Sequence, residues 1–317
     1  MKLFFYRLSV TFVMILYAFI GIFNGVPGAG SAYGAKEPAN VLLNAAVVSD
    51  LHTDGNIVRD RNIVLAKLFS GIGKSETKLD AVVMPGDITN SAAESEYRCL
   101  AAILKKYNKA ENIIPALGNH DIRGDMSVDD YEQNMQNYYD FCSALGLEID
   151  KPYHSVSVNG YCFIVLGAED EIKDRTWFSD AQLQWLDSEL AKAAESGKPA
   201  FIINHQVIDH TNDVDALWYY DGSIGEQSDA VRDTILSYSD NGLPVIFISG
   251  HLHADFSDSS FEKYGGGLYC LNLPSAQFNE EFGQGCMIEA YADRVEIRAR
   301  NFITGEWMPF EYTVPLG

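Results

Sequence analysis

The chain has 317 residues, of which 47% are hydrophobic and 21% charged, so it can form a large core and is not a disordered or fibrous protein. It has 23 Lys and Arg against 44 Asp and Glu, which gives a formal net charge of −21. This acidity argues against a nucleic-acid polymer as a partner, because a polyphosphate backbone binds basic surfaces. It also raises the question of how an anionic substrate would bind, since the field of the whole protein repels it.

The first 35 residues have the pattern of an exported protein. Lys2 and Arg7 precede a nearly uncharged run over residues 8–23, and small residues follow over 25–35. This order is typical of a secretory signal peptide. The apolar run, about 16 residues, is short for a membrane-spanning helix, which needs about 20. An uncleaved N-terminal anchor is the alternative, and it would be the only expected membrane contact. We expect a secreted or cell-envelope protein with a single domain over residues 40–317.

After this segment, short apolar runs alternate with longer amphipathic stretches. The runs predict buried strands over residues 41–48, 79–84, 112–117, 161–166, 200–203 and 244–248. Helices are expected over residues 57–72, 91–108, 128–145, 180–196 and 229–240, the fourth between Ser179 and Gly197. From Phe261 on, short strand-like runs predict antiparallel sheet. The alternation predicts an α/β fold with a sheet flanked by helices.

Polar clusters follow five of the expected strands directly. In chain order they are Asp50-Leu51-His52, Gly86-Asp87, Gly118-Asn119-His120-Asp121, Asn204-His205 and Gly250-His251-Leu252-His253. Five of the seven histidines fall in these clusters. In open α/β sheets, ligand sites assemble at the carboxyl ends of the strands, so these side chains are expected to lie close together.

The clusters offer a set of ligands suited to divalent metal ions. The candidate ligands are Asp50, His52, Asp87, Asn119, His205, His251 and His253. Mixed nitrogen and oxygen ligands favour Mn, Zn or Fe over a structural thiolate zinc site. Seven ligands exceed the need of one ion, so two ions sharing a carboxylate are predicted. Asp87 is the expected bridge, because Gly86 before it allows close approach of the backbone.

The order of these motifs resembles the calcineurin-like metallophosphoesterases, whose pattern is DxH, GD, GNH(D/E), H and GHxH. The matching span, from Asp50 to His253, covers most of the chain. The resemblance implies a four-layer αββα sandwich, in which two mixed central sheets are flanked by helices. It also implies a dinuclear metal centre. One ion would be held by Asp50, His52, Asp87 and His253, and the other by Asp87, Asn119, His205 and His251.

The resemblance further implies that His120 is the catalytic histidine near the leaving group, with Asp121 as its orienting partner. Two ions would lower the pKa of a shared water, and the resulting hydroxide would attack phosphorus in line.

Purple acid phosphatases have a metal-binding tyrosine three residues after the bridging aspartate, where this chain has Asn90. His205 is followed by Gln206-Val207-Ile208, where relatives often have His-x-Pro.

Three further side chains are candidates for contact with a substrate: Arg123, His154 and His210. Arg123 could bind a phosphate oxygen or instead form a surface ion pair. The alternatives to substrate contact are that His154 merely caps a strand and that His210 is solvated. The sequence thus favours a phosphodiesterase for a small phosphoester, such as a cyclic nucleotide or a glycerophosphodiester. A phosphomonoesterase or nucleotidase on the same centre, and a metal-free binding scaffold, stay open as alternatives.

Overall fold

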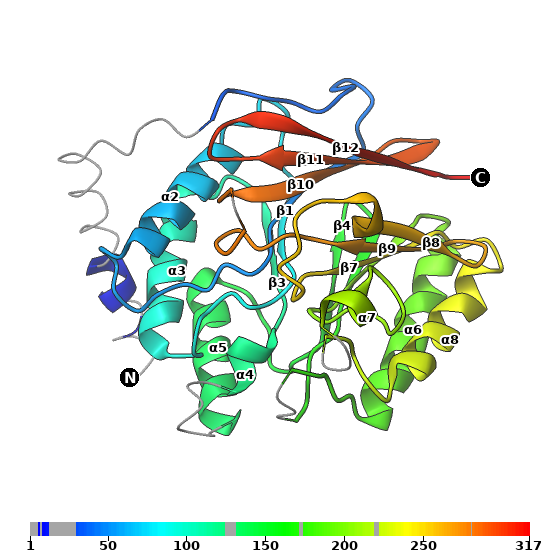
Figure 1. The fold of residues 1–317 in the computed structure, drawn as a ribbon, viewed down its shortest axis with the longest axis horizontal. Coiled ribbons are helices and arrows are strands. Elements are labelled where there is room, and N and C mark those ends of the chain that lie inside the picture. Colours follow the sequence, from blue (N-terminus) through cyan, green and yellow to red (C-terminus); the bar gives the residue numbers. More distant parts are fainter. Residues whose placement is uncertain are drawn as a thin grey trace.

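The computed structural model shows two β-sheets packed face to face between two layers of helices (Figure 1). It describes residues 6, 8–12, 30–123, 131–170, 174–218, 222–279 and 281–317. This arrangement confirms the predicted four-layer α/β sandwich.

The first sheet has the strand order β12-β11-β10-β1-β2-β3. Strands β1 (Leu43–Val47), β2 (Ala81–Met84) and β3 (Asn112–Pro115) run parallel, and β10 (Gln284–Ala290) pairs antiparallel with β1. Strands β11 (Arg294–Asn301) and β12 (Glu306–Pro315) continue the antiparallel part. The end of the chain therefore completes a sheet that its beginning starts.

The second sheet has the order β4-β5-β6-β7-β9-β8. Strands β5 (Tyr161–Val165), β6 (Ala200–Ile203), β7 (Val245–Ser249) and β9 (Leu268–Asn272) are parallel. Strands β4 (His154–Val158) and β8 (Phe261–Tyr264) are antiparallel edges. The expectation of antiparallel sheet after Phe261 is confirmed for the β8–β9 pair and for β10, β11 and β12. Strand β9 departs from it on its other side, where it pairs parallel with β7.

Helices cover the outer face of each sheet. Against the first sheet pack α2 (Asp60–Ile72), α3 (Glu94–Tyr107) and α5 (Tyr131–Leu145), and against the second α6 (Asp180–Ser196) and α8 (Ser228–Ser239). Ser179 caps α6 by accepting a hydrogen bond from the Gln182 backbone N–H, and Gly197 ends it at φ 67°. Short helices α4 (Asn119–Arg123) and α7 (Val214–Leu217) and the 3-10 turn η1 (Asp258–Ser260) lie in connections.

The core consists of layers that follow the alternation of the strands. In β1, Leu43, Ala45 and Val47 face the second sheet, whereas Ala46 faces the helices. Strands buried on both faces explain the continuous apolar runs in the sequence. Because both faces of these strands are packed with apolar side chains, the polar clusters lie past the strand ends.

The folded part begins earlier than the expected boundary at residue 35. Tyr33 is buried and its hydroxyl donates to the Ile72 carbonyl oxygen at 2.9 Å, while the Gly30 N–H donates to Ile303. Residues 30–35 thus pack against the domain, which corrects the expected start at residue 40. Tyr6 and Val10 are also buried against the first helical layer. Among the described residues, no helix combines the length and apolar character needed to cross a membrane.

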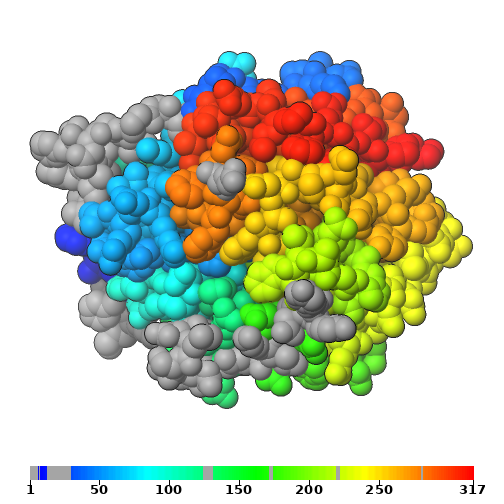
Figure 2. Space-filling view, viewed as in Figure 1, coloured from blue at the N-terminus to red at the C-terminus, as the bar shows by residue number. Residues whose placement is uncertain are grey.

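Figure 2 shows one face of the molecule in space-filling form. The C-terminal strands form one border of this face, next to the segment from about residue 250 to 285. The five cysteines are free thiols.

Candidate metal centre

The predicted ligands form two groups that share one carboxylate. Asp50, His52, Asp87 and His253 offer ligand atoms within 4.8 Å of one another, and so do Asp87, His205 and His251. Each of these residues follows a strand end, so the parallel strands of both sheets deliver their side chains to one place. Asp87 belongs to both groups, as expected of a bridging ligand.

The backbone at the centre departs from ordinary conformations. Five of the seven predicted ligands have positive φ: Asp50, His52, Asp87, His251 and His253, at 53°, 40°, 46°, 70° and 50°. Such conformations cost about 1–3 kcal/mol each and persist where the surroundings impose them. These sharp turns end each strand abruptly and direct the side chains that follow the strand toward the centre.

Two motif glycines permit the close approach of neighbouring loops. A Cβ at Gly118 would lie 2.2 Å from Asp87 Oδ1, and one at Gly250 would lie 2.3 Å from Asp50 Oδ2. Any side chain there would displace a carboxylate of the centre. The glycines of these motifs are therefore explained by space around the two aspartates.

The donor atoms are arranged for cations. His253 Nε2 lies 2.9 Å from Asp50 Oδ1, His205 Nε2 lies 3.2 Å from Asp87 Oδ2, and the Nε2 atoms of His52 and His253 are 3.2 Å apart. His205 Nδ1 donates to the Pro85 carbonyl oxygen at 2.8 Å, which leaves its Nε2 lone pair facing the centre. Asn119 Oδ1 is buried without a hydrogen-bond partner among the described residues. Opposed lone pairs and an unpaired buried oxygen fit two divalent ions.

Burial and mutual charge shift the pKa values of these groups in opposite directions. Burial lowers the pKa of His52 to about 3 and, together with the charge of His205, lowers that of His251 to about 4. Burial also raises the pKa of Asp87, but the charge of His205 and the hydrogen bond with it outweigh burial, so the pKa of Asp87 falls well below its usual value. Burial lowers the pKa of His205, but the charges of Asp87 and Asp50 outweigh burial and raise it to about 9. A bound ion would displace that proton, because neutral imidazoles and ionised carboxylates are the forms that bind metal ions.

His120 lies at the edge of the centre and is held by two groups. Its Nδ1 lies 2.7 Å from the Asn90 carbonyl oxygen, and its Nε2 lies 2.9 Å from Arg123 Nη2. A carbonyl oxygen only accepts and a guanidinium only donates, so Nδ1 carries the proton and Nε2 accepts. The imidazole is edge-on to His52, with ring centroids 4.8 Å apart.

Asp121 does not orient His120, contrary to expectation. Its carboxylate accepts hydrogen bonds from the backbone N–H groups of Ile88, Thr89 and Gly118 and from the Thr89 hydroxyl. Among the described residues, no hydrogen bond joins it to the His120 ring, whose orienting partner is Asn90 instead. Burial, and then the charge of Asp87, raise the pKa of Asp121 to about 7. Asp121 clamps the loop of Asp87 to the loop of Asn119.

The three expected substrate contacts have different positions. Arg123 is nearly buried beside His120 and pairs with Asp174 at 2.6 Å. Both ring nitrogens of His154 are buried without partners among the described residues, so this histidine offers no exposed nitrogen to a substrate. His210 is exposed and forms an ion pair with Asp215 at 2.7 Å, which raises its pKa. Only Arg123 contacts the centre.

The structure also places side chains at the centre that no motif indicated. Phe278 stacks on His253 with ring centroids 5.2 Å apart, and Trp218 lies against His251 at 4.8 Å. The Arg61 guanidinium lies 4.7 Å above Phe278 and donates to Asn90 Oδ1 at 3.0 Å. These residues come from segments far apart in the chain, so no local pattern could have identified them.

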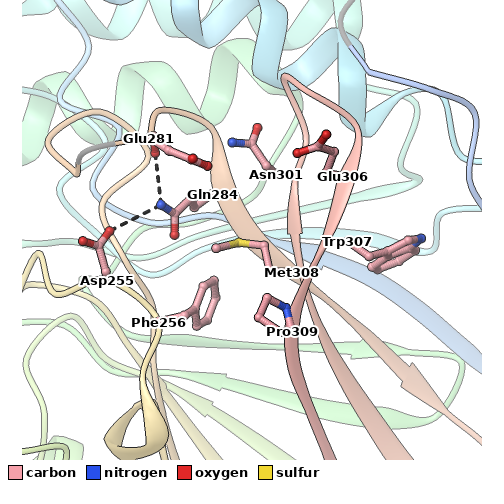
Figure 3. Close-up of a pocket in the computed structure, with 9 residues that line it drawn as sticks. All are labelled: Asp255, Phe256, Glu281, Gln284, Asn301, Glu306, Trp307, Met308 and Pro309. Carbon is pink, nitrogen blue, oxygen red and sulfur yellow. Dashed lines mark hydrogen bonds between the residues drawn. The ribbon is translucent and has the colours of Figure 1, made fainter.

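A separate hollow of about 350 Å³ lies between β12 and the loops after His253 and before β10 (Figure 3). Its charged lining residues, Asp255, Glu281 and Glu306, are all acidic. Gln284 donates from Nε2 to Asp255 and to the Glu281 carbonyl oxygen. This hollow repels phosphate, whereas Arg61 and Arg123 flank the metal centre.

A four-layer fold with two ligand groups sharing a carboxylate defines the class of dinuclear metallohydrolases. The model of the calcineurin-like phosphoesterase family matches residues 43–255, two thirds of the chain. The chain belongs to this family.

Two curated relatives are similar to this chain in sequence, and one solved structure is similar in fold. The chain is 32% identical over 146 residues to a probable cyclic nucleotide phosphodiesterase of Rhodococcus erythropolis, a match that covers 44% of this chain and 42% of the relative. It is 26% identical over 167 residues to a similarly named protein of Fibrobacter succinogenes, with coverage of 52% and 57%. The matches thus span about half the length of these relatives. A dimetal phosphatase from Danio rerio shares the fold with a TM-score of 0.60 at 14% identity, covering 88% of this chain and all of that one.

Proposed function

We propose that this protein is a phosphodiesterase for small phosphodiesters, such as cyclic nucleotides, that uses two divalent ions chosen from Mn, Zn and Fe. The observation that carries the proposal is the pair of ligand groups sharing Asp87, with His120 and Arg123 beside them. One ion would be held by Asp50, His52, Asp87 and His253. The other would be held by Asp87, Asn119, His205 and His251.

Two ions bound there would activate water for attack on phosphorus and offset charge on the phosphoryl oxygens. Arg123 Nη2, which now donates to His120 Nε2, would donate to a substrate oxygen. His120 Nε2 would then be free to carry a proton and pass it to the departing oxygen. The Asn90 carbonyl oxygen keeps the other proton on Nδ1 throughout.

The names of the two curated relatives support a diester rather than a monoester as substrate. The local charge supports a small anion. Two divalent ions, together with Arg61 and Arg123, would create a locally positive electrostatic potential in an otherwise acidic protein. This answers the question raised by the net charge of −21.

The test is a substrate panel on the metal-free protein reloaded with Mn, Zn or Fe. We expect bis-p-nitrophenyl phosphate and cyclic AMP to be hydrolysed faster than p-nitrophenyl phosphate and AMP. Preference for the monoesters would instead assign a phosphomonoesterase or nucleotidase. No hydrolysis with any ion would assign a binding scaffold. The Asp87→Asn variant is the control, since it weakens both ion sites and should abolish metal-dependent turnover.

We also propose that the protein is exported, on the basis of the basic start, apolar run and small residues of its N-terminus. Because residues from Gly30 on pack against the domain, cleavage would fall before Gly30. The N-terminal sequence of the protein recovered from the cell envelope or medium tests both points.

A further inference from the structure

Asp174 contacts two residues of the centre with a single oxygen atom. Its Oδ1 accepts from Arg123 Nη1 at 2.6 Å and from Asn119 Nδ2 at 3.3 Å. The residue is 9% exposed, so both contacts are formed away from bulk water. Asp174 lies in the connection before α6, more than 50 residues after Asn119, and no motif includes it.

The contact with Asn119 decides which end of its amide faces the centre. A side-chain amide has an oxygen that can bind a cation and a nitrogen that cannot. The Asp174 carboxylate can accept a hydrogen bond only from the amide nitrogen of Asn119. This contact directs the amide oxygen of Asn119, Oδ1, toward the other ligands. Asn119 Oδ1 is accordingly the buried atom without a protein partner among the described residues.

The contact with Arg123 fixes the other arm of the same guanidinium. Nη1 binds Asp174 while Nη2 lies 2.9 Å from His120 Nε2. The planar guanidinium holds these two donors in a rigid fork, so binding one places the other. Asp174 thereby sets the position of the donor that meets His120 and the substrate.

The segment of Asp174 is itself held by the residue after His205. Gln206 Nε2 donates to the Asp174 carbonyl oxygen at 3.4 Å, and Thr176 donates its hydroxyl hydrogen to Gln206 Oε1. Asn119 follows β3 of the first sheet, and His205 follows β6 of the second. Residues 174–176 therefore tie together ligands that the two sheets supply separately.

We propose that Asp174 is a positioning residue that holds Asn119 for the ion shared by Asp87, His205 and His251, and holds Arg123 against His120. This inference rests on the dinuclear site of the proposed function. Asp50, His52, Asp87 and His253 would hold the other ion without Asn119, so the affinity for that ion should not depend on Asp174.

The test measures Mn²⁺ binding by equilibrium dialysis and calorimetry, with electron paramagnetic resonance to separate paired from single ions. In Asp174→Ala, we expect one of the two affinities, that of the ion held with Asn119, to fall about 10–100-fold, the loss usual for a residue that orients a metal ligand. The other affinity should stay within about 3-fold, and the spectrum should change from a coupled pair to single Mn²⁺ at stoichiometric loading. Asp174→Asn should recover part of the loss, because its amide oxygen can accept the same two bonds.

The matched control is Glu189→Ala, which removes another buried carboxylate, one paired with Lys192 on α6. It should leave both affinities unchanged. Unchanged binding in both Asp174 variants would overturn the inference, as would an equal loss in the Glu189 control, which would indicate general destabilisation. Two bound ions without phosphoester hydrolysis in the unmodified protein would refute the proposed function alone. Binding of fewer than two ions there would refute both.

Discussion

At the scale of single residues, the centre depends on backbone conformations that side chains usually avoid. Asp50, His52 and Asp87 sit at positive φ, and backbone hydrogen bonds hold them there. The Asp50 backbone N–H donates to the Gly86 carbonyl oxygen, and the His52 backbone N–H donates to the Asp87 carbonyl oxygen. The strand ends of the first sheet thus support one another, and the strain stays at the residues that carry the chemistry.

His120 should affect turnover without affecting metal content. Its ring contacts Asn90 and Arg123, and it belongs to neither ligand group. His120→Ala should therefore keep two ions and lose about 10²–10⁴-fold in kcat, the usual contribution of a general acid. Metal analysis beside steady-state kinetics checks this. A variant with full turnover, or one without ions, would disprove the role.

At the scale of elements, the edge strand β4 carries His154, whose two ring nitrogens are buried without hydrogen-bond partners among the described residues. Burial lowers the pKa of His154 to about 4, whereas the unfolded chain binds this proton near its ordinary value of 6.5. Between these values the unfolded state holds more protons, so acidification from about pH 6.5 to 4 destabilises the fold. His154 therefore makes β4 sensitive to acid.

Replacing His154 by Phe should remove this sensitivity while keeping a ring of similar size in β4. From pH 7 to pH 5, the unmodified protein should lose about 2 kcal/mol more unfolding free energy than His154→Phe, on the basis of these two pKa values. Urea denaturation of both metal-free proteins at the two pH values measures the difference. Equal losses would show that the imidazole accepts a proton in the folded state at an ordinary pKa.

At the scale of the whole molecule, residues 30–36 pack against the C-terminal strands β11 and β12 and the turn between them. Tyr33 packs against Phe302 and Trp307 at centroid distances of 6.0 Å, and the Arg300 guanidinium lies 4.2 Å above its ring. Arg300 is itself almost fully buried and donates to the Ser31 carbonyl oxygen. A segment that reads as the end of a signal peptide thus completes the packing of β11 and β12.

Tyr33→Ala should reduce stability markedly, by about 3–5 kcal/mol, as is usual for truncating a buried aromatic side chain. Phe282→Ala, at a half-exposed position, should cost less than about 1 kcal/mol. Thermal and urea unfolding of the two variants provide the comparison. If the Tyr33 variant were as stable as the Phe282 variant, residues 30–36 would lie outside the cooperative unit.

The sequence by itself predicted buried strands flanked by helices and the candidate ligands of the centre, and its resemblance to a family implied the four layers and the two ligand groups. Short Val- and Ile-rich runs can be buried on both faces only as strands, and polar residues directly after them must lie at the sheet edge. Tertiary structure alone decided what surrounds those ligands. Asp121 faces the loop of Asp87 and not His120, the ring nitrogens of His154 are buried, and Asp174 contacts Asn119 across 55 residues. Such contacts join segments far apart in the chain, and their partners depend on how the two sheets pack, which no local pattern encodes.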